Sequence, residues 1–326
     1  MSILITGGAG YIGSHMVYGC LEQGRNVVVL DNLSTGLRSL VAENAHFHES
    51  DAGDQELLKR LIHTYSITAV VHFAGSVVVP ESVENPLAYY ANNTMVSRDL
   101  IEVCVQERVK HFIFSSTAAV YGMPEQNPVS ETAPTSPINP YGRSKLMTEW
   151  MLEDASRADG LQIGILRYFN VAGGDPQGRT GQSTPRATHL IKRACQAALG
   201  RIPALEIFGT DFPTRDGTGV RDYIHVTDLI AAHFRLLEHL ESGGTSLVLN
   251  CGYGHGFSVR EVIDTVSRVT GRKIATREAP RRPGDPPEII ADSKQLKSLL
   301  HWRPERDNLE EIVASAYHWE RKLNSV

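Results

Sequence analysis

A tyrosine and a lysine four residues apart, Tyr141 and Lys145, are the side chains of this sequence best suited to acid–base chemistry. On a helix, two residues at this spacing lie one turn apart on the same face. A free tyrosine has a pKa near ~10 and is a poor base at neutral pH, but a nearby ammonium stabilises the phenolate and lowers that pKa. We therefore expect Tyr141 to act as a general base toward a hydroxyl group, with Lys145 as the cation that tunes it.

A run of small hydroxyl residues precedes this pair, in the segment Ser115–Gly122. It follows the apolar run Phe112–Ser115, so we expect it at the carboxyl edge of a strand. Thr117 is placed there to hydrogen-bond a substrate hydroxyl or the oxygen of Tyr141. The alternative interpretation is a hydroxyl that only caps a turn.

A glycine-rich turn near the N-terminus indicates which kind of ligand would bind beside these groups. Gly7, Gly10 and Gly13 follow the apolar run Ile3–Thr6 and open a helix-like stretch. In such a turn, backbone N–H groups can approach a pyrophosphate, which the N-terminal end of the helix also attracts. The spacing is GxxGxxG rather than GxGxxG. The prediction of a dinucleotide site therefore depends largely on the strand before this turn and the helix after it.

The kind of dinucleotide follows from Asp31, which ends the next apolar run. An acidic side chain there accepts hydrogen bonds from ribose hydroxyls and repels a 2′-phosphate, which favours NAD over NADP. Arg38 keeps NADP open as the alternative, because a guanidinium binds phosphate. Asp51 is placed either to reach the adenine or to serve as a turn residue. Phe73-Ala74-Gly75 offers small residues against which the cofactor can lie.

The elements that must position these side chains alternate along the first half of the chain. Apolar runs occur at Ile3–Thr6, Asn26–Leu30, Ala69–Phe73, Phe112–Ser115 and Gln162–Leu166, and helix-like stretches at Tyr11–Gln23, Gln55–Tyr65, Leu87–Glu107 and Tyr141–Ser156. Such alternation is typical of βαβ units, and continuous apolar runs are typical of strands covered on both faces. The predicted fold class is therefore α/β, with a doubly wound, Rossmann-like parallel sheet.

The pattern loosens after Tyr168, and Gly173 to Pro185 has the composition of a loop. We expect an NAD-binding domain over residues 1–172, which carries Tyr141 and Lys145, and a smaller α/β substrate-binding domain over residues 173–326. Within the second domain, Ser258-Val259-Arg260-Glu261 fits a helix capping box and Leu309–Leu323 reads as an amphipathic helix. A second domain that closes over the carboxyl edge of the sheet would form a pocket there.

Composition narrows the classes of partner. The chain has 326 residues and a net charge of −5, which gives no indication of nucleic-acid or anionic-membrane binding. Four cysteines lie far apart without a CxxC pair and 13 histidines are scattered, so we expect free thiols and no metal. No apolar run reaches the ~20 residues of a membrane span, and no signal sequence is seen, so the expected location is cytoplasmic.

Taken together, these motifs resemble those of the extended short-chain dehydrogenase/reductases, and within them those of the UDP-glucose 4-epimerases. The resemblance runs nearly from end to end. It is carried by the segments Thr6–His15, Asp31–Ser34, His72–Gly75, Tyr89–Asn93, Ser115–Gly122, Tyr141–Lys145, Leu166–Asn170, Asp216–Val226 and Arg281–Asp285.

This resemblance implies a tightly held NAD that is not consumed. Tyr141 would take the proton of the sugar 4-hydroxyl while C4 gives up hydride, the 4-keto sugar would turn over, and hydride would return to its opposite face. Thr117 would orient the proton and Lys145 would hold the nicotinamide ribose. The family also implies a homodimer, formed through the helices of Leu87–Glu107 and Tyr141–Ser156.

The site residues that the resemblance implies fall into two sets. The cofactor set is Gly7, Gly10, Tyr11, Ile12, Gly13, Asp31, Asn32, Ser34, Thr35, Gly36, Asp51, Ala52, Phe73, Ala74, Gly75, Asn92, Ser115, Tyr141, Lys145 and Tyr168. The UDP-sugar set is Thr117, Phe169, Asn170, Thr188, His189, Leu190, Phe208, Arg221, Tyr223, Arg282, Asp285 and Ile289. Asn170, Arg221 and Arg282 would bind the diphosphate, and Asp285 would lie near the uridine ribose.

Five positions depart from the commonest pattern of the family. Thr117 stands where a serine is frequent, and Val77 stands where many members have a lysine near the cofactor phosphates. Thr188-His189 replaces an Asn-Asn pair in the substrate loop. Ile289 stands where a bulky tyrosine excludes N-acetylated sugars in some members and a small residue admits them, so acceptance of UDP-N-acetylglucosamine stays open.

Other functions on this fold are weighed against the same residues. Sugar-nucleotide dehydratases and decarboxylases need acidic residues directly after the Ser/Thr hydroxyl, where this chain has Ala118 and Ala119. A UDP-N-acetylglucosamine, UDP-pentose or UDP-uronate 4-epimerase remains an alternative. An oxidoreductase that exchanges free cofactor is less favoured, and so is a non-catalytic NAD-sensing protein, because Tyr141 and Lys145 are both intact.

Overall fold

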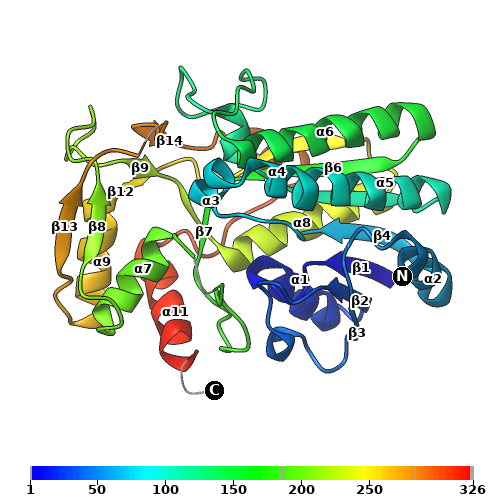
Figure 1. The fold of residues 1–326 in the computed structure, drawn as a ribbon, viewed down its shortest axis with the longest axis horizontal. Helices are drawn as coiled ribbons and strands as arrows, with labels where there is room; N and C mark the ends of the chain where they lie inside the picture. Colours follow the sequence, from blue (N-terminus) through cyan, green and yellow to red (C-terminus); the bar gives the residue numbers. More distant parts are fainter. Residues whose placement is uncertain (1, 185–186, 283, 324–326) are drawn as a thin grey trace.

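The computed structural model describes residues 2–184, 187–282 and 284–323, so that Pro185 and Pro283 of the segments above lie outside it. A seven-stranded parallel sheet forms the larger part of the molecule (Figure 1). Its order is β11 (Leu247–Cys251), β6 (Gln162–Tyr168), β5 (His111–Thr117), β4 (Ile67–His72), β1 (Ser2–Thr6), β2 (Asn26–Asp31) and β3 (His46–Glu49).

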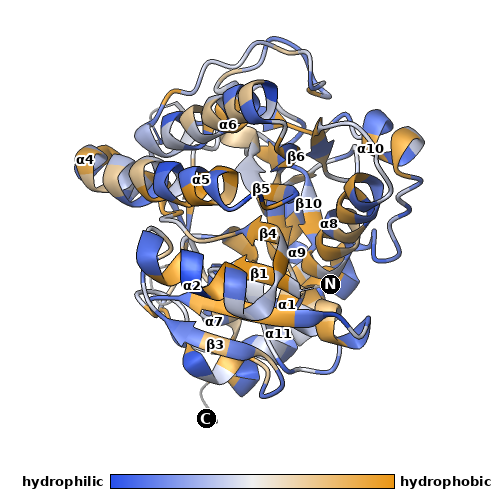
Figure 2. Ribbon diagram, turned by 90° about the vertical axis from the view of Figure 1, so that its right-hand side faces the viewer, coloured by the Kyte–Doolittle hydropathy of each residue, from blue (hydrophilic) through white to orange (hydrophobic). Residues whose placement is uncertain are grey.

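Helices cover both faces of this sheet, which explains why its central strands are buried along nearly their whole length and apolar in their middle (Figure 2). One layer consists of α2 (Gln55–Tyr65), α5 (Val96–Gln106) and α6 (Pro140–Asp159), and the other of α1 (Tyr11–Glu22) and α8 (Val226–Glu241). Short helices α3 (Val79–Glu84) and α4 (Pro86–Tyr89) pack against α6. The predicted Rossmann-like α/β class is confirmed.

A smaller group of elements lies beyond the carboxyl edge of the sheet (Figure 1). Its helices are α7 (Leu190–Ala198), α9 (Val259–Thr270) and α11 (Leu309–Lys322), with α10 (Lys294–Leu299) against β11. Its strands pair as β10 (Tyr223–His225) with β7 (Asn170–Ala172), β13 (Thr276–Ala279) with β8 (Leu205–Phe208), and β12 (Phe257–Ser258) and β14 (Glu288–Ile289) with β9 (Val220–Arg221). The predicted capping box at Ser258 is confirmed, because Ser258 and Glu261 cap each other.

The chain passes between the main sheet and the smaller group of elements several times, rather than once at residue 172. After β7 it enters the smaller group, returns through α8 and β11 to the seven-stranded sheet, and then leaves again. β11 pairs with β6 from Leu247 to Cys251, and α8 packs against β5 and β6. Residues 226–251 therefore belong to the sheet, which differs from a division into 1–172 and 173–326. The pairing of β11 depends on a partner about 80 residues away, which local periodicity does not reveal.

The helical stretch expected at Leu87–Glu107 is interrupted. Between α4 and α5, residues Tyr90–Met95 form a π-helical turn, η2. Such a turn inserts one residue into the helix and rotates the following side chains, a device frequent at functional sites. Here the side-chain amides of two consecutive residues both bond Ser76. The amide of Asn92 donates to the Ser76 hydroxyl at 2.9 Å. The amide of Asn93 accepts from the backbone N–H of Ser76 at 2.7 Å and donates to its backbone oxygen at 3.0 Å.

The four cysteines, Cys20, Cys104, Cys195 and Cys251, are free and buried. Across the described ranges, no helix combines the length and apolar character that crossing a membrane requires.

Candidate active site

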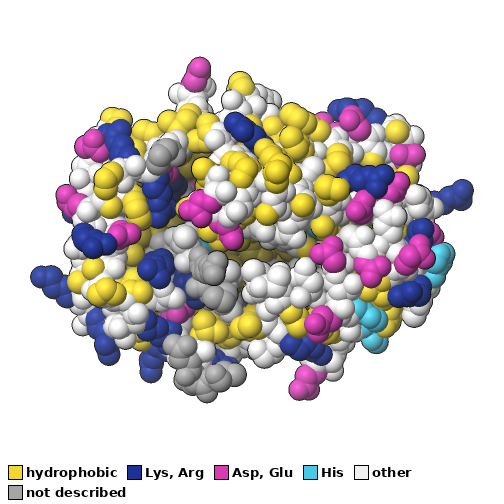
Figure 3. All heavy atoms as spheres, in the orientation of Figure 1, with side chains coloured by type: hydrophobic (Ala, Val, Ile, Leu, Met, Phe, Trp, Pro, Cys, Tyr) yellow, Lys and Arg dark blue, Asp and Glu magenta, His cyan; other side chains and the backbone are white. Residues whose placement is uncertain are grey.

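One large cavity of about 1590 Å³ lies between the carboxyl edge of the sheet and the smaller group of elements. Figure 3 shows the hollow across the middle of this face of the molecule. Pockets for one small ligand measure roughly 300–1,000 Å³. The cavity therefore has room for two ligands, and it contains the glycine-rich turn as well as Tyr141 and Arg221.

The glycine-rich turn between β1 and α1 has no space for side chains at two positions. Gly7 has φ +70°, and a Cβ there would lie 2.6 Å from the backbone N of Ala74. A Cβ on Gly13 would lie 2.2 Å from the backbone oxygen of Gly7. Helix α1 begins after Gly10, which has no capping side chain. The N–H groups of its first turn are therefore open to an anion, as a pyrophosphate site requires.

Asp31 lies at the end of β2, beside this turn. Its buried carboxylate accepts hydrogen bonds from the backbone N–H of Ala9 at 2.9 Å and of Leu33 at 2.8 Å. Burial raises the pKa of Asp31, while these two bonds hold it down. Arg38, the residue that kept NADP open, stacks on the Phe47 ring with 4.4 Å between its guanidinium carbon and the ring centre. Of these two side chains, Asp31 lines the cavity formed by the described residues and Arg38 does not.

The catalytic pair lies on α6, and both side chains are buried. The ammonium of Lys145 donates a hydrogen bond to the backbone oxygen of Ser115 at 3.0 Å and lies 4.8 Å from the centre of the Phe114 ring. Burial lowers the pKa of Lys145 to about 8, and the carboxylate of Glu149 partly counteracts that effect.

The pKa of Tyr141 follows its burial rather than the charge of Lys145, which differs from the expectation that the ammonium lowers it. Burial raises the pKa of Tyr141, and the Thr117 hydroxyl is the group that lowers it. The physical reason is desolvation, which disfavours the phenolate of Tyr141 and the ammonium of Lys145 alike. A further positive charge in the cavity would favour the phenolate of Tyr141 and so lower its pKa.

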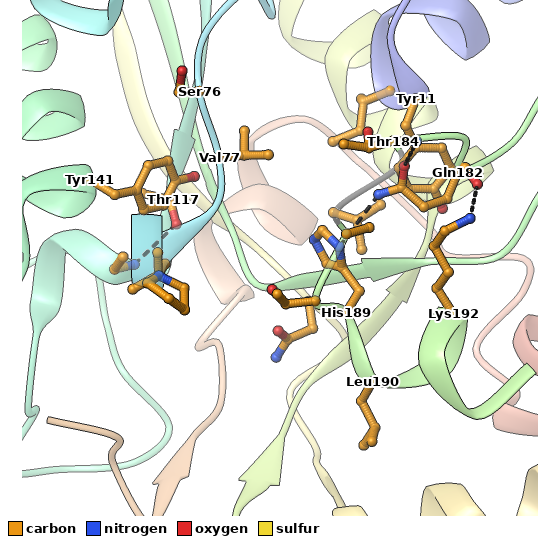
Figure 4. Close-up of a pocket in the computed structure, with 18 of the residues that line it drawn as sticks. Tyr11, Ser76, Val77, Thr117, Tyr141, Gln182, Thr184, His189, Leu190 and Lys192 are labelled. Carbon is orange, nitrogen blue, oxygen red and sulfur yellow. Dashed lines mark hydrogen bonds between the residues drawn. The ribbon is translucent and has the colours of Figure 1, made fainter. Parts of the chain in front are cut away.

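Thr117 serves both of the roles considered for it. Its side chain accepts a hydrogen bond from the backbone N–H of Ala119 at 3.1 Å, where it caps the short helix η3 (Ala118–Tyr121). The same hydroxyl lies beside the Tyr141 ring (Figure 4). Ala118 and Ala119 also line the cavity, so methyl groups stand where an elimination would need acidic side chains.

The far side of the cavity carries the charged groups of the smaller part. Arg221 on β9 pairs with Asp285, and the guanidinium carbon of Arg282 lies 3.8 Å from the centre of the Phe208 ring. Ile289 on β14 is the register partner of Arg221, which brings the two to the same wall. Two arginines next to an aromatic ring can bind a diphosphate and a base.

His189 lies in the cavity between Thr117 on one side and Lys192 on the other (Figure 4). Its Nδ1 lies 3.4 Å from the amide nitrogen of Gln182, whose backbone oxygen accepts a hydrogen bond from the Lys192 ammonium at 2.7 Å. Burial, with a smaller contribution from Lys192, lowers the pKa of His189. Sequence reasoning missed Gln182 and Lys192. Neither belongs to a recognisable motif, and only the fold brings them to the cavity wall.

The structure brings nearly all of the expected site residues to this one cavity. Of the cofactor set, only Gly36 does not line the cavity formed by the described residues. A Cβ on Gly36 would lie 2.9 Å from the backbone of Ala9, so this glycine allows its loop to pack on the glycine-rich turn. All twelve residues of the UDP-sugar set line the cavity, and so does Val77, which is 42% exposed.

Within the part of the chain that the structure describes, no three His, Cys, Asp or Glu side chains form a cluster that would hold a metal ion.

Comparisons with known proteins place these features in a family. Residues 3–252 match the model of the NAD dependent epimerase/dehydratase family. The chain is 56% identical over 321 residues to a UDP-glucose 4-epimerase of Azospirillum brasilense, covering 98% of this chain and 92% of the relative.

Solved structures give the same picture. The crystal structure of a UDP-glucose 4-epimerase from Brucella ovis in complex with NAD superposes with a TM-score of 0.95 at 44% identity, covering 98% of each chain. The UDP-Glc/GlcNAc 4-epimerase of Campylobacter jejuni superposes with a TM-score of 0.86 at 48% identity, covering 98% of this chain and 99% of that one.

Proposed function

Because the chain belongs to the NAD dependent epimerase/dehydratase family, we propose that it is an NAD-dependent enzyme that inverts C4 of UDP-glucose and UDP-galactose. One observation carries this proposal. A general base and a hydroxyl, Tyr141 and Thr117, line the same cavity as a dinucleotide-type turn and a pair of arginines. Such an arrangement suits a UDP-sugar that is bound through its diphosphate while its sugar hydroxyl is oxidised beside the dinucleotide.

The residues around the glycine-rich turn fit NAD. The close contacts at Gly7 and Gly13 let the backbone approach a pyrophosphate, and the buried carboxylate of Asp31 keeps free acceptor sites for ribose hydroxyls. When bound, NAD accepts the hydride of C4 and returns it. We propose that the remaining members of the cofactor set line its binding site, with Gly36 supporting the turn from outside the cavity.

The chain's own groups handle the proton. Tyr141 accepts the proton of the sugar 4-hydroxyl and gives it back after the ring has turned. Thr117 donates a hydrogen bond that stabilises the phenolate during this exchange. Lys145 supplies a positive charge one turn away and is held in place by the backbone oxygen of Ser115. The methyl groups of Ala118 and Ala119 give the keto sugar no acid or base for elimination, so hydride return is the remaining outcome.

Inversion requires the sugar to rotate while its diphosphate stays bound. We propose that Asn170, Arg221 and Arg282 hold the diphosphate and Asp285 the uridine ribose. The ion pair of Arg221 with Asp285 and the stacking of Arg282 on Phe208 keep these groups at the far wall of the cavity. The sugar would then turn in the space bounded by Thr117, His189 and Ile289.

A direct assay tests this function. Purified protein, with no NAD added, is incubated with UDP-galactose and the formation of UDP-glucose is followed. We expect conversion, together with one NAD per chain released on denaturation. Retained NAD without conversion would contradict the glucose/galactose assignment, and UDP-pentoses and UDP-uronates would be tested next. A requirement for added NAD in stoichiometric amounts would instead favour an oxidoreductase.

We also propose a homodimer. Four apolar side chains lie exposed on neighbouring elements: Leu87 (79% exposed) on α4, Met95 (63%) on η2, and Met147 (37%) and Trp150 (53%) on α6. Figure 2 shows α4 at the edge of the molecule. Since an exposed group of this kind favours association, and α6 also carries Tyr141, a second copy of the chain is the proposed occupant of this apolar face.

Two further proposals concern organisation and location. We propose that residues 1–172 together with 226–251 bind NAD, and that the other residues after 172 bind the UDP-sugar. The division follows from the return of α8 and β11 to the main sheet. We propose the cytoplasm as the location, since four free, buried thiols suit a reducing compartment.

A further inference from the structure

A third side chain continues the line of the catalytic pair along α6. Tyr141, Lys145 and Glu149 follow one another at intervals of four residues and are 8%, 3% and 1% exposed. They therefore lie on successive turns of one buried face. Glu149 is too deep to contact a ligand in the cavity, and it is absent from the residues that line it. Glu149 can therefore influence a reaction in the cavity only through the residues that it contacts.

Three consecutive residues at the end of β5 hold this helix face. The backbone oxygen of Ser115 accepts a hydrogen bond from Lys145, and the hydroxyl of Ser116 donates one to Glu149. The hydroxyl of Thr117 hydrogen-bonds Tyr141. Each residue of the catalytic face is thus tied to its own residue of the strand. Loss of the Ser116–Glu149 bond would loosen the register that places Thr117 opposite Tyr141.

Glu149 is also one half of a buried ion pair. Arg167 on β6 donates to its carboxylate from Nη2 at 2.6 Å and from Nε at 3.1 Å to each oxygen. Arg167 is the register partner of Ser116, so the carboxylate of Glu149 binds side chains near the ends of both β5 and β6. Nη1 of Arg167 donates to the Tyr121 hydroxyl at 3.1 Å, and that hydroxyl donates to Asn250 at 2.7 Å.

Charge is therefore unevenly distributed behind the active site. Two cations, Lys145 and Arg167, share the influence of the carboxylate of Glu149. In a region with little water, removing that carboxylate leaves the charge of buried Arg167 without its ion-pair partner and raises the positive potential at the catalytic pair. A more positive potential disfavours the ammonium of Lys145 and favours the phenolate of Tyr141.

We propose that Glu149 is a positioning residue for C4 epimerisation, which offsets the charges of Lys145 and Arg167 and, through Ser116, fixes the end of β5 against α6. The inference rests on the proposed function for its kinetic consequences but not for its electrostatic ones. It predicts that removal of the Glu149 charge moves the titration of both Tyr141 and Lys145 toward lower pH. A merely structural side chain would lower the rate and leave the titration where it was.

Other ionisable groups also face this part of α6, and the single substitution Glu149→Gln leaves each of them in place. Among the described residues they are Tyr89 from α4 with Glu81 behind it, His72 from β4, Tyr121 from η3, Glu131 from the following loop, and Arg167 and Tyr168 from β6. None of them is altered by the substitution Glu149→Gln, which removes a charge and keeps the shape of the side chain.

The experiment measures kcat of the NAD-loaded protein between about pH 5.5 and pH 9.5. For Glu149→Gln we expect both limbs of the profile about 0.5–1 unit lower than in the parent protein, with kcat at pH 8 reduced by about tenfold. Glu149→Asp keeps the charge and is expected to lose rate without moving the profile. In the double variant Glu149→Gln, Arg167→Met the two opposite charges disappear together, so the profile should return.

A profile of Glu149→Gln that stays in place, or one that does not return in the double variant, would overturn the proposal. If Glu149→Gln does not fold, Arg167→Met carries the test with the opposite sign, because it leaves an unpaired carboxylate. Its profile is expected to move to higher pH, and an unmoved profile would overturn the proposal as well.

A second readout separates this inference from the proposed function. The tyrosinate absorbance of Tyr141, taken as the difference from a Tyr141→Phe protein in the same background, reports its titration without any turnover. If the parent protein does not convert UDP-galactose, the proposed function fails, yet the tyrosinate titration of Glu149→Gln is still expected at lower pH. An unchanged titration would contradict the role of Glu149 in either case.

Discussion

The ammonium of Lys145 is anchored by the backbone oxygen of Ser115, at 3.0 Å, rather than by a directly bonded carboxylate. A carbonyl oxygen fixes the position of the ammonium but offsets only part of the cost of burying its charge, which explains why the pKa of Lys145 falls to about 8. The cation one turn from Tyr141 is therefore itself close to losing its proton at the upper end of the physiological range.

Replacing Tyr141 by Phe should abolish most of the activity. The substitution removes the group that exchanges a proton with the sugar and keeps the ring that fills the space. Because general acid–base catalysis contributes about 10²–10⁴-fold, we expect kcat to fall by about that factor. NAD released on denaturation serves as the control and should remain at one per chain. An active Tyr141→Phe protein would show that another group carries the proton.

Two glycines of the cofactor turn should differ in their tolerance of a methyl group. A Cβ at Gly13 would lie 2.2 Å from the oxygen of Gly7, whereas one at Gly10 would lie 3.2 Å from the same atom. We expect Gly13→Ala to lose NAD during purification and Gly10→Ala to retain most of it. NAD content per chain is measured by absorbance after denaturation. Equal retention in the two proteins would mean that the turn can move apart.

The size of residue 289 should set the tolerance for an N-acetyl group. Ile289 lines the cavity next to Phe169 and is held by the pairing of β14 with β9. We expect Ile289→Ala to raise, and Ile289→Tyr to lower, the ratio of kcat/KM for UDP-N-acetylglucosamine to that for UDP-glucose, each by about tenfold. Val129→Ala removes volume from the same apolar cluster away from the cavity and should leave the ratio unchanged.

Acid should destabilise the fold through buried imidazoles. Burial lowers the pKa of His233 to about 4, and its Nδ1 donates to the backbone oxygen of Leu229 at 2.9 Å. The folded pKa lies below the unfolded one, so the unfolded chain binds the extra proton as the pH falls from about 6.5. The free energy of unfolding should therefore decrease between about pH 6.5 and pH 4, by about 1.4 kcal/mol per unit for this residue.

The check is urea denaturation at several pH values for the parent protein and for His233→Leu. The variant should lose less stability than the parent on acidification, whatever its stability at pH 7. His318→Gln, at an exposed position on α11, is the matched control. Equal slopes for the parent protein and His233→Leu would show that His233 becomes protonated without unfolding.

Charges on the apolar face should dissociate the proposed dimer. The substitution Leu87→Glu together with Trp150→Glu places two carboxylates among the exposed apolar residues of α4 and α6. We expect the sedimentation coefficient to change from that of a dimer to that of a monomer. Leu299→Glu, which alters another exposed leucine, on α10, should leave the dimer intact. A parent protein that sediments as a monomer would refute the proposal.

Local sequence patterns predicted much of the fold because short-range geometry controls them. Helix α2 was expected at Gln55–Tyr65 and is found there, since Asp54 caps its first turn and its apolar residues recur at helical spacing. The glycine-rich turn and the capping box at Ser258 depend on residues only a few positions apart. The π-helical turn η2 was missed, because one inserted residue hardly alters the apolar period around it.

What the sequence by itself determined was the chemistry: the glycine-rich turn, the acidic end of β2, and the pair Tyr141 and Lys145. Each is set by residue types at short spacing. The tertiary structure alone decided that β11 returns to the main sheet and that Arg167 and Ser116 meet Glu149. It also decided that burial, not the neighbouring ammonium, governs the pKa of Tyr141. Strand pairing and desolvation depend on residues far apart in the chain, and these come together only when the core closes.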